Sequence, residues 1–354
     1  MQSASTPAAT ATNIVSKVYG PIGHIELDRA AKLNALTLQM LAELTRVLKQ
    51  WAKDPAISLV LLTGRGERAF CAGGDIADFH RAVTTGAHQE FIDLLSMEFD
   101  LDYLISTYPK PLITLAHGIT MGGGVGLASH APVRLVTQSA TMGMPEAKIG
   151  YTPDVGGSHL LANTPGYFGE YFAMSAASFT GADAVYLGFA DVVINDSFAE
   201  NILDELDEFV GLSAGEIISA IEVLHGAPES YALELSQGWV DHAFSADSPQ
   251  EVLERLEKMV HPAAQQAAQS ILANSPSSIS SAFYTVRQAR AEQDLRSALD
   301  RELRMARHLM HLPDLAEGIR AQVIDKDRNP RWSRAAISNV DQQALRSLAE
   351  GTEL

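Results

Sequence analysis

Residues 112–126 read LITLAHGITMGGGVG, and this stretch decides the fold. Its first five residues are apolar apart from one threonine, which predicts a strand buried on both faces. The glycines that follow predict a tight turn into a helix, because glycine lacks the Cβ that would block a close approach of the backbone. A strand, a turn and a helix in this order predict one unit of an α/β fold.

Further strands and helices alternate on both sides of this stretch. Leucines and a tryptophan recur at steps of three and four over Leu38–Trp51, which predicts an amphipathic helix. Short apolar runs predict strands at 15–19, 24–27, 57–62, 133–137 and 141–144. We therefore expect an α/β core over residues 14–200.

The texture of the sequence changes after about Asp196, where helical patterns dominate. Helices are predicted over 201–210, 249–259, 263–273, 279–290 and 295–309. Ser275-Pro276 is typical of a helix start rather than of a linker. We expect a flexible N-terminal tail over 1–13 and a helical C-terminal region over 201–354. The apolar faces of its helices either pack back onto the core or join copies in a homo-oligomer.

Composition excludes several classes of protein. Of the 354 residues, 46% are hydrophobic and 19% charged, so a sizeable core is expected. With 26 basic and 43 acidic residues the net charge is −17, which argues against nucleic acid as a partner. The single cysteine, Cys71, fits a reducing compartment. Neither a membrane span nor a targeting signal is recognisable, so no membrane partner and a cytoplasmic location are predicted.

Several catalytic motifs are missing from the sequence. It contains no G-x-S-x-G, S-x-x-K, H-E-x-x-H or C-x-x-C pattern, and its histidines lack metal-ligand spacing. Nucleophilic serine and zinc-water mechanisms therefore have no support, and no metal is expected. Cys71 lies between Phe70 and Ala72, which favours a buried structural cysteine over a reactive thiolate.

Two glycine-rich turns remain as candidates for chemistry. The first is CAGGD at 71–75, and the second is MGGG at 121–124. Each alone is read most simply as a tight strand-to-helix turn. Together they permit an oxyanion hole, because two backbone N–H groups can converge on one carbonyl oxygen.

Two carboxylates follow in the stretch MPEAKIGYTPDVGG, residues 144–157. Glu146 and Asp154 stand eight residues apart, among glycines and prolines that favour a folded-back loop. Paired carboxylates in an apolar setting can divide nucleophile or base work from acid work. Taken singly, Glu146 fits the first turn of a helix and Asp154 fits an Asx turn or N-cap.

Taken in order, these pieces resemble the enoyl-CoA hydratase/isomerase (crotonase) superfamily. The similarity runs from KLNAL at 32–36 through CAGGD, HGITMGGGVG and PEAKIG to FTGADA at 179–184 and LGFADVV at 187–193. It implies a crotonase-like spiral of ββα units with a helical C-terminal region. It also implies that the N–H groups of Gly74 and Gly123 form the oxyanion hole for a CoA thioester.

Departures from the hydratase pattern point to one branch of the superfamily. Hydratases carry a glutamate where this chain has Gly126, and a glycine where it has Asp154. The arrangement resembles the 3-hydroxyisobutyryl-CoA hydrolase branch, as do SPSS at 275–278 and IDKDRNPRW at 324–332. This resemblance implies Glu146 and Asp154 as catalytic residues and Glu98 as a substrate contact. For Glu98, the alternative is a solvated helix face.

The resemblance implies hydrolysis of 3-hydroxyisobutyryl-CoA, or of a closely related 3-hydroxyacyl-CoA, in valine breakdown. Glu146 would attack the carbonyl or activate water, and Asp154 would hold the 3-hydroxyl. Tyr151-Thr152 departs locally from the branch and bears on the acyl pocket, which Phe79, Phe91 and Tyr151 are candidates to line. CoA arrives with the substrate, so no separate cofactor is expected. Candidates for its phosphates are Arg29, Lys32, Arg65 and Arg68, with Lys32 favoured because it lies in a matching motif.

Two other functions stay open at the level of sequence. One is an enoyl-CoA hydratase or isomerase that uses Glu146 alone. The other is a protein that binds acyl-CoA without turning it over.

Overall fold

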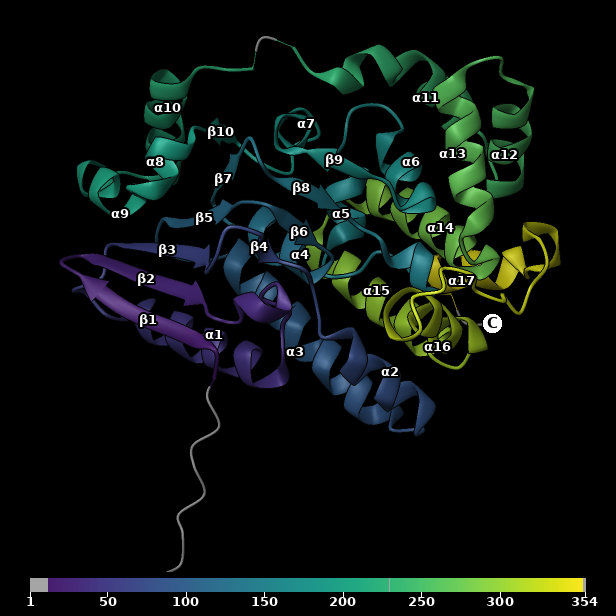
Figure 1. Ribbon diagram of the computed structural model, residues 1–354, viewed down its shortest axis with the longest axis horizontal. Helices are drawn as coiled ribbons and strands as arrows, with labels where there is room; N and C mark the ends of the chain where they lie inside the picture. Colours follow the sequence, from purple (N-terminus) through teal and green to yellow (C-terminus); the bar gives the residue numbers. More distant parts are fainter. Residues whose placement is uncertain (1–11, 229, 353–354) are drawn as a thin grey trace, which may run out of the picture.

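The computed structural model describes residues 12–228 and 230–352 and arranges them around two β-sheets (Figure 1). Residues 1–11 of the predicted tail lie outside the described residues. In the larger sheet the first two strands, β1 (Ile14–Tyr19) and β2 (Ile22–Leu27), form an antiparallel hairpin, and all other neighbouring strands are parallel. Its strands, in spatial order, are β1 (Ile14–Tyr19), β2 (Ile22–Leu27), β3 (Leu59–Gly64), β5 (Leu112–Ala116), β7 (Val133–Thr137) and β10 (Val192–Ile194).

The smaller sheet has the order β4 (Ala69–Cys71), β6 (Ile119–Met121), β8 (Thr141–Gly143) and β9 (Ser178–Thr180). The first three of these strands are parallel, and β9 is antiparallel to β8. The chain passes from a strand of the larger sheet to one of the smaller sheet three times, from β3 to β4, from β5 to β6 and from β7 to β8. Helices follow each passage, which is the predicted spiral of ββα units.

The helices of the core follow from their sequences. Thr37 caps α1 (Leu38–Trp51), because its side chain accepts a hydrogen bond from Met40 N, and the leucine face of α1 is buried. The other core helices are α2 (Ile76–Thr84), α3 (His88–Ser106), α4 (Gly123–Ser129), the 3₁₀ helix Glu146–Ile149, α5 (Gly157–Ala162), α6 (Phe168–Ser175) and α7 (Gly181–Tyr186).

The C-terminal region is helical, as predicted, and packs onto the core. Ser275 caps α14 (Pro276–Glu292) and Pro276 is its first residue, so this stretch does start a helix. One hydrophobic cluster runs from Ile25 in β2 through Phe283 in α14 to Ala349 in the last helix. The helices are α8 (Asp196–Glu200), α9 (Ile202–Glu205), α10 (Ala214–His225), α11 (Gln237–Phe244), α12 (Pro249–Lys258), α13 (Pro262–Ala273), α14 (Pro276–Glu292), α15 (Leu295–Leu309), α16 (Pro313–Ile319) and α17 (Gln342–Glu350).

Several predicted elements have other bounds in the structure, and two of them differ for a clear physical reason. The strand predicted over 57–62 is Leu59–Gly64, because its pairing with β2 begins at Leu59 and Ile57 belongs to the preceding turn. The helix predicted over 201–210 breaks into α9 and the 3₁₀ helix Leu206–Phe209. Its four carboxylates within five residues repel one another along a continuous helix.

The structure also bears on two further expectations, which concern Cys71 and membrane-spanning helices. Cys71 is buried in β4, and burial raises the pKa of its thiol to about 12, which confirms a structural cysteine. Within the described ranges, no helix combines the length and apolar character that a membrane crossing needs.

Candidate active site

Three neighbouring parallel strands end at the same edge of the smaller sheet. The turn after β4 carries Gly73 and Gly74, the turn after β6 carries Gly122 and Gly123, and Glu146 follows β8. Because the strands are parallel, all three segments leave the sheet on one side, where open α/β sheets bind their ligands. The ladder thus brings together residues that are more than 70 positions apart in the sequence.

The two glycine turns lie against each other. Gly73 has a φ of +95°, and a Cβ on it would lie 2.9 Å from Met121 O and 3.4 Å from Gly123 N. Leu36 N donates to Gly73 O and Asp75 N donates to Leu36 O, so the N–H of Gly74 between them points away from Leu36. Among the described residues neither Gly74 N nor Gly123 N donates to a protein acceptor. Both predicted oxyanion-hole donors are therefore free.

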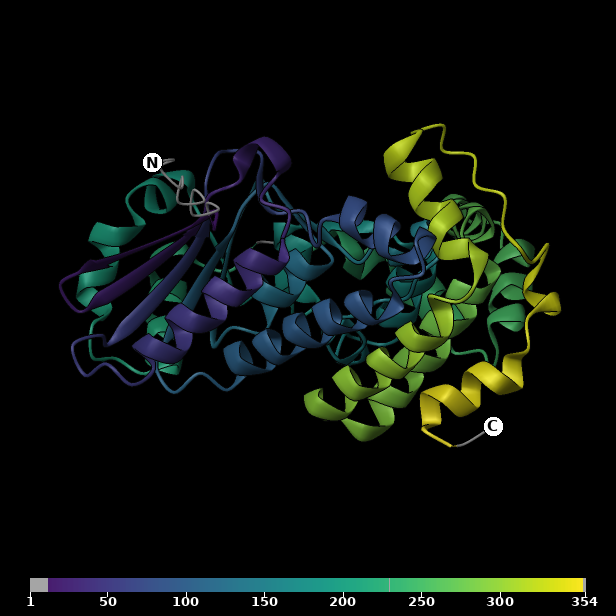
Figure 2. The ribbon, with the colours of Figure 1, turned by 90° about the horizontal axis from the view of Figure 1, so that it is seen from below.

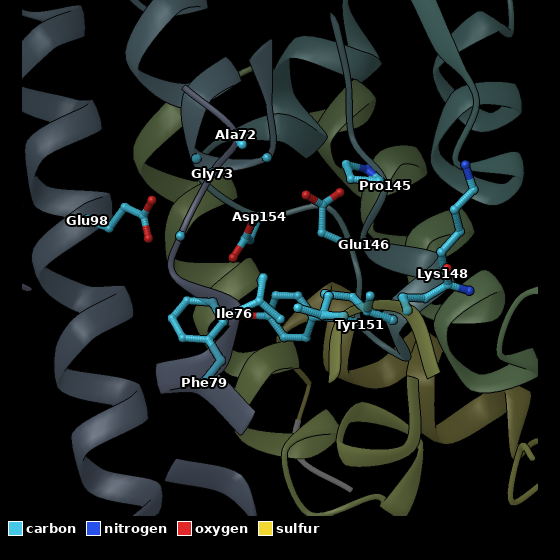
Figure 3. A pocket seen from close by; sticks show the side chains of 16 residues that line it. Ala72, Gly73, Ile76, Phe79, Glu98, Pro145, Glu146, Lys148, Tyr151 and Asp154 are labelled. Atoms are coloured by element: carbon cyan, nitrogen blue, oxygen red, sulfur yellow. The ribbon is translucent and has the colours of Figure 1, made fainter. Parts of the chain in front are cut away.

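Both glycines line one cavity of about 230 Å³ (Figure 3). Its wall comes from both glycine turns, from α2 and α3, from the segment after β8 and from the π-helix Arg320–Ile324 in the C-terminal region. The lining residues are Ala72, Gly73, Gly74, Ile76, Phe79, Glu98, Gly122, Gly123, Pro145, Glu146, Lys148, Ile149, Tyr151, Asp154, Gln322 and Val323.

Glu146 turns its carboxyl into this cavity. It is the first residue of its 3₁₀ helix, in agreement with the alternative of a first-turn helix residue, yet its side chain lines the cavity. Oε1 lies 2.9 Å from the point that a Cβ on Gly122 would occupy, so it adjoins the oxyanion turn. Oε2 is buried and has no hydrogen-bond partner among the described residues. Burial, with the neighbouring carboxylates Glu302 and Glu98, raises the pKa of Glu146 to about 8.

Asp154 lies in the loop between Gly150 and Gly156, and only 5% of it is exposed. Figure 3 shows it between Glu98 and Glu146. Burial is the main cause that raises its pKa well above the usual range, and the charge of Glu146 adds to this. The two predicted catalytic carboxyls therefore share one cavity and influence each other's titration.

The Asp154 loop is held from two sides. Glu302 in α15 accepts hydrogen bonds from Gly156 N at 2.8 Å, Ser158 N at 2.9 Å and Ser158 Oγ at 2.5 Å. His130 Nε2 lies 2.8 Å from Val155 O. Both anchors are buried, so the loop that carries Asp154 is fixed by the core and by the C-terminal region together.

Glu98 faces the cavity from the middle of α3. It is 2% exposed, so the solvated-face alternative is wrong. A Cβ on Gly123 would overlap its Oε1, which places the carboxyl beside the second oxyanion donor. Burial raises the pKa of Glu98 to about 7.

A family model described as enoyl-CoA hydratase/isomerase matches residues 22–348. The chain belongs to this family. A zebrafish (Danio rerio) relative named 3-hydroxyisobutyryl-CoA hydrolase, mitochondrial, is 32% identical over 94% of this chain and 88% of its own length. That name does not support the predicted cytoplasmic location, which stays a prediction.

Two solved structures share this architecture. An enoyl-CoA hydratase from Rhodobacter sphaeroides is 34% identical, covers 95% of this chain and 97% of its own, and has a TM-score of 0.88. A carnitinyl-CoA dehydratase from Mycobacterium thermoresistibile is 33% identical, covers 95% and 96%, and has the same TM-score. The crotonase-like fold is thereby confirmed.

The basic residues proposed for CoA lie outside the cavity of this family member. Lys32 is exposed at the end of the 3₁₀ helix Ala30–Lys32, so its substrate contact stays a prediction. Arg29 pairs with Asp75 at 2.8 Å, and Arg65 pairs with Glu26 and Asp28. Arg68 is exposed. Paired guanidinium groups offer less charge to a phosphate, which leaves Lys32 and Arg68 as the better candidates.

The space beside Gly126, the position of the glutamate in the hydratase pattern, is occupied by side chains from other elements. A Cβ on Gly126 would lie 2.8 Å from Asp102 Oδ1 and 2.9 Å from Val155 Cβ. Asp102 is fully buried in α3, one turn after Glu98, and neither of its oxygens has a partner among the described residues. Burial raises the pKa of Asp102 well above its usual range.

Sequence reasoning missed four residues at or behind this site: Asp102, Lys148, Glu302 and Gln322. Lys148 lines the cavity and donates to Ala176 O at 2.7 Å, and Gln322 reaches the wall from the C-terminal region. No local pattern marks Asp102 or Glu302, because each lies in an ordinary α-helical stretch, and none marks Gln322 in the π-helix. Lys148 could have been identified from the sequence, since it belongs to the PEAKIG motif.

Proposed function

We propose that the protein hydrolyses 3-hydroxyisobutyryl-CoA, or a closely related short 3-hydroxyacyl-CoA, to the free hydroxy acid and CoA. One observation carries the proposal: the carboxyl of Glu146 adjoins the Gly122–Gly123 turn, and the same cavity is lined by Gly74 and Gly123, whose N–H groups donate to no acceptor among the described residues. The name of the zebrafish relative supports the substrate. The link to valine breakdown comes from the family resemblance.

In the proposed reaction, the thioester oxygen accepts hydrogen bonds from Gly74 N and Gly123 N. These donors stabilise the negative charge that forms on the oxygen when the carbonyl is attacked. Glu146 supplies the attack, either with its own oxygen to give a mixed anhydride or by taking a proton from a water molecule. The C–S bond then breaks and the CoA sulfur takes up a proton, so the net change consumes one water.

Asp154 has the second proposed role, which is to hold the 3-hydroxyl and to assist proton transfer. Burial raises the pKa of Asp154 well above its usual range, which favours the protonated carboxyl that can give its proton to the leaving thiolate. Water hydrolyses any anhydride that forms on Glu146 and regenerates the carboxyl. The scheme requires no metal and no cofactor beyond the CoA of the substrate.

Hydration of an enoyl-CoA is the second candidate, because the solved relatives carry hydratase and dehydratase names. The filled space at Gly126 argues against it. Gly126 itself carries no carboxyl, and Asp102, whose carboxyl lies beside it, does not line the cavity. Asp154 approaches the cavity from a different loop instead.

The test is release of free thiol from 3-hydroxyisobutyryl-, 3-hydroxypropionyl-, crotonyl- and acetyl-CoA, with enoyl absorbance followed in parallel. We expect thiol release from the 3-hydroxyacyl substrates and no loss of the enoyl band from crotonyl-CoA. Loss of that band without thiol would make the protein a hydratase. Binding by calorimetry without any turnover would make it a non-catalytic binder.

Substitution of Glu146 tests the mechanism itself. Glu146→Gln should abolish thiol release, while Glu257→Gln, an exposed change on α12, should leave it unchanged. Full activity of Glu146→Gln would overturn the proposed role of this residue.

A further inference from the structure

Tyr151 presents an unused hydrogen-bond donor to the cavity. The residue lines the cavity, is 2% exposed, and its phenolic oxygen has no partner among the described residues. Burial raises its pKa far above the usual value, so the phenol keeps its proton and can only donate or accept as a neutral group. A buried donor left unpaired costs free energy, which favours a ligand that supplies the missing acceptor.

The tyrosine ring is fixed in place by its surroundings. Tyr151 N donates to Glu146 O at 3.0 Å, which ties its backbone to the proposed catalytic glutamate. Its ring meets Phe91 edge to face at 6.1 Å between centroids, and Phe91 meets Phe79 in the same way at 5.2 Å. Phe79 and Tyr151 line the cavity as expected, and Phe91 packs behind them. The hydroxyl is therefore preorganised.

The walls around Tyr151 make its hydroxyl distinctive. Figure 3 shows Tyr151 on the same side of the cavity as Ile76 and Phe79, whose side chains are apolar. On the other side lie Glu98, Glu146 and Asp154, which offer oxygens. Ile76 and Phe79 offer no donor to an oxygen on the acyl chain. Lys148 and Gln322 also bring donors to the cavity wall, but Lys148 already donates to Ala176 O.

We propose that Tyr151 determines specificity by donating its phenolic hydrogen to an oxygen on the acyl chain of the substrate. This inference rests on the proposed function and deepens it. A substrate hydroxyl has both a hydrogen to give and lone pairs to accept, so Asp154 and Tyr151 can satisfy it from two sides. A hydrocarbon acyl group would leave the phenol unpaired, and the site would discriminate against it.

The experiment compares two thioesters that differ only in the hydroxyl. The kcat/KM for thiol release is measured with 3-hydroxyisobutyryl-CoA and with isobutyryl-CoA, for the native protein and for Tyr151→Phe. We expect the ratio of the two values to fall at least tenfold in Tyr151→Phe, with the loss confined to the hydroxylated substrate. Phenylalanine keeps the ring and its contacts with Phe91, so only the hydroxyl is removed.

Thr152→Val is the matched control. Thr152 is the adjacent residue, it is fully buried, and its hydroxyl also lacks a partner among the described residues, yet it does not line the cavity. Its removal should leave the ratio unchanged. An unchanged ratio in Tyr151→Phe, or equal losses on both substrates, would overturn the proposal.

A failure of the proposed function would look different. If the native protein releases no thiol from either thioester, calorimetry gives the dissociation constants of both, for the native protein and for Tyr151→Phe. Selective weakening of 3-hydroxyisobutyryl-CoA binding in the variant would still support the role of Tyr151. Equal affinities in both proteins would contradict it.

Discussion

Glu146 shows how the setting of one residue decides its chemistry. The same carboxyl on the surface, in the first turn of a helix, would be ionised and would interact favourably with the helix dipole. In the cavity, burial and the nearby carboxylates raise the pKa of Glu146 to about 8. A protonated Glu146 can neither attack a thioester nor take a proton from water. Its titration therefore controls the proposed reaction.

We expect kcat/KM for thiol release to fall about tenfold for each pH unit below about 8 and to level off above it. The sign follows from the raised pKa, because most of the enzyme carries the inactive, protonated glutamate at pH 7. A pH–rate profile between 6 and 9, corrected for uncatalysed hydrolysis, measures this. The apparent value belongs to the coupled carboxyls as a group. A flat profile over this range would contradict the assignment.

Gly123→Ala tests the oxyanion hole by adding one methyl group beside it. The new Cβ would overlap Glu98 Oε1 and disturb the donor next to it, so thiol release should fall by about 10²–10³. Gly215→Ala is the control, since a Cβ there has nothing within 4 Å and the site lies on α10. Activity of Gly123→Ala within twofold of the native protein would speak against the donor role.

The loop that carries Asp154 is the element on which the site depends most. Val155 has a φ of +53° and Gly156 one of +72°, so the loop is not held by regular backbone pairing. Its geometry comes instead from Glu302 in α15, whose carboxylate receives three hydrogen bonds from Gly156 and Ser158. An element of the C-terminal region thereby positions a residue of the core.

Glu302→Gln should weaken this element. One of the donors would then face an amide N–H₂ in place of a carboxylate oxygen, which costs about 1–3 kcal/mol. We expect a lower free energy of unfolding in urea together with slower thiol release. Glu257→Gln, on an exposed face, is the control for the loss of one negative charge. Equal stability and activity of the two variants would show that Glu302 does not hold the loop.

The α/β core and the helical C-terminal region pack together into one unit. Figures 1 and 2 show α15 and α16 beside α2 and α3, and the cavity takes part of its wall from Gln322 and Val323. The apolar faces of α14 and α15 belong to the same hydrophobic cluster as the sheet. The boundary predicted near residue 200 stays a prediction, as does a homo-oligomer.

A shortened chain that ends at Glu200 tests whether the core depends on the C-terminal region. It would lose the cover over the core, the Glu302 anchor and one cavity wall. We therefore expect it to lack near-UV circular dichroism and a sharp urea transition, as a loosely packed chain does. The full chain, measured under the same conditions, is the control. A cooperative transition in the shortened chain would show instead that residues 12–200 fold independently.

By itself, the sequence determined the elements whose signals are local. The bounds of α1, β5 and β7 follow from periodicity and apolar runs, and the glycine turns and the Glu146–Asp154 pair follow from ordered motifs. Only the tertiary structure decided that Glu98 is buried, that Asp102 fills the space beside Gly126, and that Glu302 anchors the Asp154 loop. The bond from Gly156 to Glu302 spans 146 positions in the chain. Such contacts depend on how separate helices pack, and no short stretch of sequence encodes that distance.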